Sequence, residues 1–156
     1  MTTDWLDPPM RAALEAMSEA QRVALVLAGE ARSEPIEGIV AVASVIRNRV
    51  KAGRFGEGYS GVVTRPKQFS CLFPQGGKQN YKRVLDMALQ FARKEPVTEP
   101  RLLQCIAVAE CVMRDYFLDN TRGSCHYAVY TLTPDWAKGK KPVARIGSHH
   151  FWNDIL

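Results

Sequence analysis

The chain has 156 residues, of which 46% are hydrophobic and 24% are charged. These values are typical of one soluble globular domain, and they exclude a disordered or fibrous chain. The net charge of +5 favours a polyanionic partner such as nucleic acid, an anionic cell wall or a membrane surface, but it does not choose among them. Basic residues that merely solvate the surface explain the charge equally well.

The beginning of the chain and its cysteines carry expectations about location and cofactors. Residues 1–7 lack the basic and apolar regions of a secretory signal peptide, and no apolar run is long enough to span a bilayer. We therefore expect synthesis in the cytosol and no stable membrane insertion. The four cysteines form no C-x-x-C pair, so we expect free and largely buried thiols. No nucleotide or metal-ligand spacing is present, and we expect no cofactor and no metal.

The first third of the chain predicts three helices. Pro8 and the run that follows it to Met17 predict a short amphipathic helix. The capping box Ser18–Gln21 then starts a second helix, which reaches about Arg32. Pro35 biases the residue before it away from helical geometry, so this helix should end near Ser33, with Pro35 at the start of the next.

The third predicted helix runs from Ile36 to Lys51. Its apolar residues occur nearly all round the helix, which predicts a place at the centre of the core. Arg47 and Arg49 near its end are interpreted as charges that complement the helix C-terminus, and Gly53 as its C-cap.

Glu30 is the candidate catalytic residue. It lies one helical step beyond Val23, Val26 and Leu27, on the apolar side of the second predicted helix, and should face the core or the floor of a cleft. A carboxylate there is costly to desolvate unless it is paired or has a function. Desolvation also raises its pKa toward the value that a general acid needs near neutral pH.

The middle of the chain predicts a long irregular segment and two more helices. Residues 54–77 are rich in Gly and Pro, which is typical of a functional loop or of short strands. Within it, Gln68, Phe69 and Ser70 combine the amide, ring and hydroxyl groups that recognise sugars, although a plain surface loop fits the composition too. Helices are predicted over about 80–93 and about 100–118, and the second should be a core helix.

The C-terminal region predicts short strands over 126–131, 142–146 and 149–152, with Gly147 as the turn between the last two. The domain is therefore predicted to be α+β and mainly α, with a small C-terminal β-element.

Four blocks of the sequence resemble one family. Residues 28–38 read A-G-E-A-R-S-E-P-I-E-G, and residues 40–50 read V-A-V-A-S-V-I-R-N-R-V. Together they resemble the signature of the spore-cortex-lytic type of cell wall hydrolase, which is close to A-E-A-R-G-E-P-x-x-G and then V-A-V-A-x-V-x-x-N-R-V. The further matching blocks, in the expected order, are Gln68–Cys71, His126-Tyr127 with Pro134–Ala137, and Ile146–Phe151. The resemblance covers about residues 21–152. Within it, this sequence differs from the usual family pattern at Gly29, Ser33 and Leu72.

The resemblance implies a lysozyme-like single catalytic domain over residues 1–156 that cleaves the β-1,4 bond between N-acetylmuramic acid and N-acetylglucosamine in peptidoglycan. Glu30 aligns with the catalytic glutamate of the family. Members are associated with lytic transglycosylase chemistry, which yields a 1,6-anhydro end. A bare catalytic domain without an export signal is similar to a phage endolysin, which stays in the cytosol until a membrane pore releases it to the cell wall.

The number of carboxylates separates two mechanisms. Glycoside hydrolysis usually takes two, set about 5–5.5 Å apart for retention or about 6.5–9.5 Å apart for inversion. Glu34 is the candidate second carboxylate, but Pro35 pulls it off the helix that carries Glu30. A lytic transglycosylase needs one acid, so we favour Glu30 alone, with Glu34 as a stabiliser, as a partner of Arg32, or as a cap or surface carboxylate.

The remaining candidate site residues are expected to line the sugar subsites, with roles in the core or in loop anchoring as the alternatives. His149 would bond sugar hydroxyls or orient backbone. The substrate-binding candidates are Glu34, Gln68, Phe69, Ser70, Tyr127, Tyr130 and His149.

Three alternative functions stay open at this level. One is a lysozyme-type muramidase, and another is a non-catalytic glycan-binding phage protein that keeps the fold. The third is a basic nucleic-acid-binding module, which is disfavoured because the basic residues are scattered and no recognition-helix signature occurs. We expect peptidoglycan strands as the partner, no nucleic acid, and a monomer.

Overall fold

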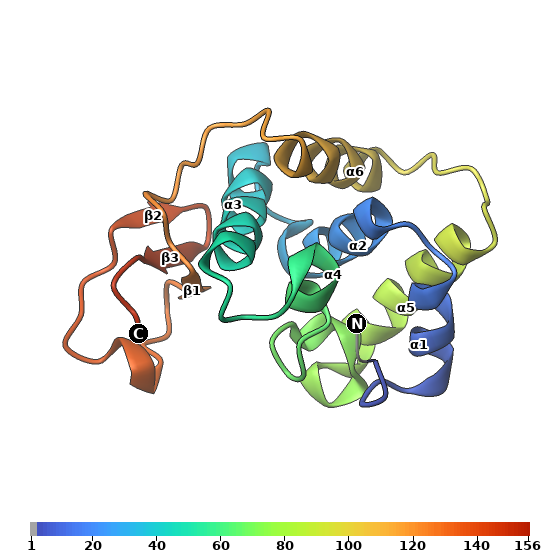
Figure 1. Ribbon diagram of the computed structural model, residues 1–156, viewed down its shortest axis with the longest axis horizontal. Coiled ribbons are helices and arrows are strands. Elements are labelled where there is room, and N and C mark those ends of the chain that lie inside the picture. Colours follow the sequence, from blue (N-terminus) through green and yellow to red (C-terminus); the bar gives the residue numbers. More distant parts are fainter. Residues whose placement is uncertain (1–2) are drawn as a thin grey trace.

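The computed structural model describes residues 3–156, and these form a mainly helical body with a small sheet on one side of it (Figure 1). The helices are α1 (Pro8–Glu15), α2 (Glu19–Ala31), α3 (Ile36–Ala52), α4 (Gly58–Val63), α5 (Lys78–Ala92) and α6 (Pro100–Met113). The strands are β1 (His126–Val129), β2 (Ala144–Ile146) and β3 (His149–Trp152), and 3-10 turns occur at η1 (Ser70–Leu72), η2 (Pro74–Gly76) and η3 (Asp135–Ala137). The predicted fold class is confirmed.

Helix α2 is the central helix, and it packs against α3, α4, α5 and α6. The predicted capping box starts it: the hydroxyl of Ser18 accepts from the backbone N–H of Gln21 at 3.1 Å, and the Gln21 side chain accepts from the Ser18 N–H at 3.0 Å. Every residue from Val23 to Ala28 is buried. A helix buried on all sides holds its last turn in a fixed position, which matters because Glu30 lies there.

Helix α3 separates the helical body from the sheet (Figure 1). One side of α3, including Ile39 and Val42, joins the main core, and the opposite side places Ala41 and Val45 against Phe151 of the sheet. This double burial explains why its apolar residues occur nearly all round the helix. Gly53 ends the helix as predicted, in the left-handed conformation with φ of 75°.

The three strands form an antiparallel sheet in the order β1-β3-β2. In the register, Tyr127 of β1 lies opposite Phe151 of β3, and Ala144 of β2 lies opposite the same residue from the other side. Gly147 makes the turn between β2 and β3 with φ of 57°, as predicted.

Two predicted elements are wrong in detail. The segment 54–77 contains helix α4 and two 3-10 turns instead of strands. Helix α6 ends at Met113 and not near Leu118, because Asp115 takes a left-handed conformation with φ of 60° and the N–H of Tyr116 turns back to the carbonyl of Cys111 at 2.8 Å. Tyr116 is consequently 76% exposed and does not belong to the core.

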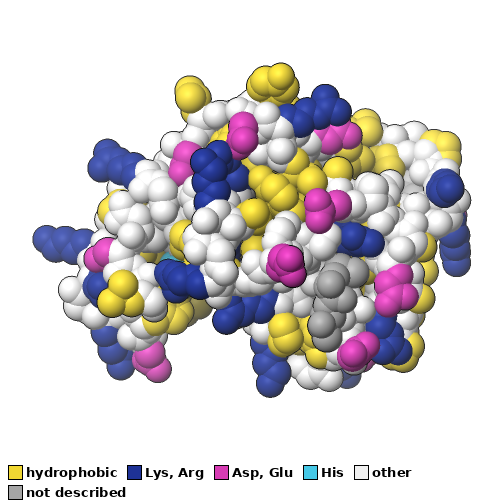
Figure 2. Space-filling model, viewed as in Figure 1, with side chains coloured by type: hydrophobic (Ala, Val, Ile, Leu, Met, Phe, Trp, Pro, Cys, Tyr) yellow, Lys and Arg dark blue, Asp and Glu magenta, His cyan; other side chains and the backbone are white. Residues whose placement is uncertain are grey.

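The described surface agrees with a scattered positive charge. Figure 2 shows Lys and Arg side chains distributed over the whole of one face, with Asp and Glu side chains between them. Within residues 3–156, no helix is long and apolar enough to cross a membrane.

Candidate active site

Glu30 occupies the last turn of α2 and is partly exposed. Burial of the carboxyl group raises its pKa from 4.5 to about 7, because the charged form loses water. A hydrogen bond from Tyr127 and the positive charge of Arg49 act in the opposite direction, since both stabilise the carboxylate. The carboxyl group can therefore exchange a proton near neutral pH, and the residue as a whole is half-buried.

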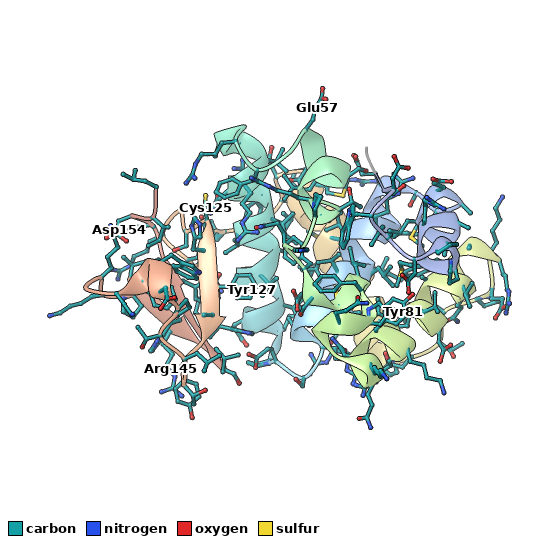
Figure 3. All side chains as sticks on the ribbon, turned by 90° about the horizontal axis from the view of Figure 1, so that it is seen from below. Glu57, Tyr81, Cys125, Tyr127, Arg145 and Asp154 are labelled. Atoms are coloured by element: carbon teal, nitrogen blue, oxygen red, sulfur yellow. The ribbon has the colours of Figure 1, made fainter. Side chains whose placement is uncertain are left out.

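Tyr127 reaches Glu30 from strand β1 and, in Figure 3, extends from the strand toward α3. Its ring stacks on Phe151 at a centroid distance of 5.9 Å and meets His149 edge-on at 5.1 Å. Burial, together with the charge of Glu30, raises the pKa of the Tyr127 phenol well above its usual value. The hydroxyl therefore keeps its proton and donates it in a hydrogen bond to the Glu30 carboxylate.

Arg49 is a buried cation beside this pair, only 7% exposed. Its Nε donates to the carbonyl of Cys125 at 2.7 Å, and its guanidinium carbon lies 5.1 Å and 5.6 Å from the ring centroids of Phe55 and Phe69. Burial lowers the pKa of Arg49, but the guanidinium group keeps its charge, as arginine does in proteins generally.

Arg49 lies in the last turn of α3 as interpreted, but the interpretation missed its burial and its contacts. The sequence did contain a signal for its burial, because residue 49 follows the buried residues Val42, Val45 and Ile46 at spacings of seven, four and three.

Glu34 is not available to a substrate, and this corrects its prediction as a binding residue. It lies outside α2, as Pro35 predicted, but it is 5% exposed. Its Oε1 accepts from the backbone N–H of Ser148 at 2.9 Å and lies 3.0 Å from Nδ1 of His149, and its Oε2 accepts from the Ser148 hydroxyl at 3.2 Å. The expected pairing with Arg32 is also wrong, since both carboxylate oxygens are bound to the β2–β3 turn and its neighbour.

Two positions beside Glu34 leave no room for a side chain, and both are occupied by glycine. A Cβ added to Gly147 would lie 2.9 Å from Oε2 of Glu34, and a Cβ added to Gly38 would lie 2.7 Å from Cβ of Glu34. Gly147 also has the positive φ that favours glycine. These two glycines therefore allow the close contact between the α2–α3 turn and the sheet.

The block 68–70 divides into one core residue and two exposed ones. Phe69 is 1% exposed and belongs to the main core, so the alternative role in the core fits it and the role in a sugar subsite does not: the ring is buried between the helices and Arg49. Gln68 and Ser70 are exposed. The Gln68 side chain lies 3.5 Å from Nη1 of Arg49, which connects it to the surroundings of Glu30.

Tyr130 is exposed and stays a candidate substrate contact, whereas His149 is buried. Tyr130 is 42% exposed, but the Arg145 guanidinium lies 3.7 Å from its ring centroid and covers that ring face. His149 is 7% exposed and held by Glu34, so its predicted contact with sugar hydroxyls is wrong and its alternative, a structural role, fits. Burial lowers the pKa of His149, whereas Glu34 opposes that shift.

Gly29 and Cys71 fix the backbone next to Glu30. A Cβ added to Gly29 would lie 2.5 Å from Cβ of Cys71, so the η1 turn packs directly on the α2 backbone. The side chain of Asn80 donates to the Gly29 carbonyl at 3.1 Å. The last turn of α2 is therefore held from the η1 and α5 side as well as from the sheet.

Residues 3–156 contain no group of three or more His, Cys, Asp or Glu side chains that could hold a metal.

Comparison with known families decides the classification. A family model described as Cell Wall Hydrolase matches residues 33–152, which is most of the chain. This chain belongs to the cell wall hydrolase family. The matched residues of this cell wall hydrolase include Glu34, Tyr127 and His149 and begin just after Glu30.

The relatives of this cell wall hydrolase include spore cortex-lytic enzymes. The Bacillus subtilis enzyme is 28% identical over 139 residues, which covers 86% of this chain and 37% of the relative. The Oceanobacillus iheyensis enzyme is 44% identical over 55 residues, which covers 35% of this chain and 20% of the relative. The chain therefore spans little more than a third, at most, of the length of these curated relatives.

Two solved catalytic domains share the fold. The catalytic domain of the germination-specific lytic transglycosylase SleB from Bacillus anthracis matches with a TM-score of 0.60 and 27% identity, over 85% of this chain and 92% of that domain. The catalytic domain of the Bacillus cereus SleB protein matches with a TM-score of 0.58 and 26% identity, over 86% and 91%. The present chain therefore corresponds to the catalytic portion of such proteins.

Proposed function

We propose that this cell wall hydrolase cleaves the glycan strands of peptidoglycan between N-acetylmuramic acid and N-acetylglucosamine, as a lytic transglycosylase with Glu30 as its single general acid and base. One observation carries the proposal: Glu30 is partly exposed and has a pKa of about 7, whereas Glu34 is buried with both oxygens bound. A group that changes protonation near neutral pH can serve both halves of such a reaction.

The proposed reaction uses one carboxyl group twice, first as an acid and then as a base. Protonated Glu30 donates its proton to the glycosidic oxygen, and the bond between that oxygen and the anomeric carbon of the muramic acid residue breaks. The Glu30 carboxylate then removes the proton of the muramic acid 6-hydroxyl while that oxygen attacks the anomeric carbon. The product is a 1,6-anhydro ring, and no water is consumed. Between the two steps, Tyr127 and Arg49 stabilise the Glu30 carboxylate.

The hydrolytic alternative is less well supported by this site. A muramidase requires a second carboxylate that contacts water or the anomeric carbon. Glu34 is the nearest candidate in sequence, but Ser148 and His149 occupy its oxygens. The names of the relatives agree with the first choice, since one of the solved catalytic domains is called a lytic transglycosylase.

The biological setting stays a prediction. We keep the phage endolysin, stored in the cytosol and released to the cell wall, as the setting to test. Spore cortex lysis is the competing setting, because the curated relatives are spore cortex-lytic enzymes. Cleavage of the same glycan bond would serve host lysis by a phage and lysis of the spore cortex alike.

Dye-labelled purified peptidoglycan tests the proposed activity. We expect the unmodified protein to release soluble dye, and Glu30→Gln to release it at least a hundredfold more slowly, because a general acid contributes about 10² to 10⁴ in rate. Circular dichroism should show that the variant is folded. Full activity of a folded Glu30→Gln protein would contradict the role of Glu30. Binding of glycan without release by the unmodified protein would instead identify a non-catalytic glycan-binding protein.

A further inference from the structure

A hollow lies between α2, α5 and α6, and α2 packs against both of the other helices (Figure 1). Its volume is about 520 Å³. Arg32, Arg83 and Arg101 line it, one from each helix or its end, and the only acidic residue in its wall is Glu99. Three arginines and one glutamate in its wall give the hollow a net positive charge.

Glu99 does not neutralise these arginines by a direct ion pair. Its two carboxylate oxygens cap α6, accepting from the backbone N–H groups of Arg101 at 3.1 Å and Leu102 at 2.6 Å. Among the ion pairs within residues 3–156, none involves Arg32, Arg83 or Arg101. Arg101 donates from Nη1 to the neutral side chain of Gln104 at 2.9 Å. Within residues 3–156, no carboxylate therefore has to be displaced from these three arginines before they bind an anion.

The rest of the wall is apolar except for Ser33. Ala28, Met87 and Leu102 contribute aliphatic surface, so the hollow combines guanidinium groups with a hydrophobic side. A carboxylate on a short aliphatic chain matches both, since arginine recognises carboxylates through paired N–H donors. Acidic peptides carry such groups, and in peptidoglycan short acidic peptides are attached to the muramic acid residues.

The position of the hollow is compatible with the same substrate. Ala28 of α2 and its C-cap Arg32 are four residues apart and share one side, while Glu30, two residues from each, faces roughly the opposite side of the same helix end. A helix with its side chains is about 10–12 Å across, so the hollow and the Glu30 carboxyl group are separated by a distance of this order. A peptide of several residues spans it, at up to about 3.5 Å per residue.

We propose that this arginine hollow binds a carboxylate of the peptide stem while the attached glycan lies at Glu30. This assignment rests on the proposed function and adds the stem as a determinant of substrate affinity. The hollow would then raise affinity without taking part in bond cleavage, so its loss affects KM and leaves kcat unchanged.

Paired substrates and variants test the assignment. We would compare Arg83→Gln/Arg101→Gln with Lys82→Gln, which removes a positive charge from the exposed neighbour of Arg83 on α5. The substrates are peptidoglycan with its stems, peptidoglycan stripped of stems by an amidase, and stem-bearing peptidoglycan freed of phosphate-containing wall polymers. Loss of two charge-assisted contacts should raise KM for the stem-bearing substrate about tenfold, with kcat within about twofold.

The outcomes separate the sources of the anion. The unmodified protein and Lys82→Gln should show a KM about tenfold higher on stem-free than on stem-bearing glycan, and the double variant should show no such difference. Equal KM values for the double variant and the unmodified protein on stem-bearing glycan would overturn the assignment. An increase in KM that follows removal of the phosphate polymers, and not of the stems, would also overturn it.

A binding measurement separates this assignment from the proposed activity. Calorimetry of Glu30→Gln with an isolated acidic stem peptide requires no turnover, so it gives a result even if the protein does not cleave glycan. Binding that the Arg83→Gln/Arg101→Gln changes weaken about tenfold supports the hollow. Binding that these changes leave unaltered refutes it.

Discussion

The carboxylate of Glu34 accepts a 2.9 Å hydrogen bond from the backbone N–H of Ser148, although 114 positions separate the two residues in the chain. This bond joins the α2–α3 turn to the β2–β3 turn, and the 3.0 Å contact between Glu34 and His149 reinforces it. The same sheet carries Tyr127 to Glu30. Glu34 therefore acts as a positioning residue: it holds the strand that completes the environment of Glu30.

Glu34→Gln should leave catalysis largely intact while it weakens the fold. The amide oxygen can still accept the Ser148 N–H, but the contact with His149 loses its charge. We expect the free energy of unfolding to fall by about 1–3 kcal/mol and kcat to stay within about tenfold at temperatures where the variant is folded. Thermal unfolding and dye release provide the two measurements.

Glu30→Gln is the matched comparison for this variant, with the opposite expected pattern. If a folded Glu34→Gln protein lost activity as completely as Glu30→Gln, Glu34 would have to be a second catalytic carboxylate. The muramidase mechanism would then replace the proposed one.

The raised pKa of Glu30 makes stability depend on pH. In the folded protein this pKa is about 7, compared with 4.5 as its ordinary value, so the folded state binds the proton more tightly. The associated stability is complete below pH 4.5 and is lost as pH rises through 7. Glu30→Gln removes this penalty, and it should be more stable than the unmodified protein at pH 8 by up to about 3 kcal/mol.

The pH series supplies its own control. At pH 4.5 the carboxyl group of the unmodified protein is protonated in the fold, so the stability advantage of Glu30→Gln should disappear there. Denaturant unfolding at both pH values measures the difference. An equal effect of the substitution at pH 4.5 and pH 8 would show that the pKa of Glu30 is not raised.

Tyr127→Phe should shift the pH dependence of catalysis. The hydrogen bond from Tyr127 lowers the pKa of Glu30, so its removal raises that pKa, and the decline of kcat/KM above about pH 7 should move to higher pH. The rate should also fall by about tenfold, because the carboxylate formed in the first step loses a donor. Tyr130→Phe, which changes the tyrosine next to Arg145, should leave the pH profile unchanged.

Arg49 should affect both stability and the acid. Arg49→Gln removes a positive charge that lowers the pKa of Glu30, so the alkaline decline of kcat/KM should move to higher pH. Arg49→Lys keeps the charge but cannot reproduce the guanidinium contacts with Cys125 and Gln68, so it should lose about 1–3 kcal/mol of stability with little change in the pH profile. If Arg49→Gln and Arg49→Lys gave the same dependence of kcat/KM on pH, the charge of Arg49 would not influence the pKa of Glu30.

Local signals were sufficient to predict most of the fold. The Ser18 capping box, Pro35 and Gly53 each act within a few residues: the first two mark the starts of α2 and α3, and Gly53 marks the end of α3. The short C-terminal segments, with Gly147 as a turn between two of them, similarly predicted the strands. Glu30 could be singled out because an acidic residue interrupts an apolar helical stripe.

Contacts between distant segments account for what the sequence did not predict. Nothing near Glu34 indicates that Ser148 and His149 bind it, so its role as a positioning residue was missed. Phe69 was interpreted by its ring chemistry, whereas the neighbouring helices determine its burial. The early end of α6 depends on the backbone of Asp115, whose Oδ1 accepts from Nε of Arg47 at 2.7 Å, 68 positions away in the chain.

The masses of the soluble fragments released from purified peptidoglycan test the single-acid mechanism most directly. The unmodified protein should release muropeptides with a 1,6-anhydro end, one water lighter than hydrolytic products. Glu34→Gln should release the same fragments, and Glu30→Gln should release none above background. Fragments with ordinary reducing ends from the unmodified protein would contradict the mechanism and require a second carboxylate.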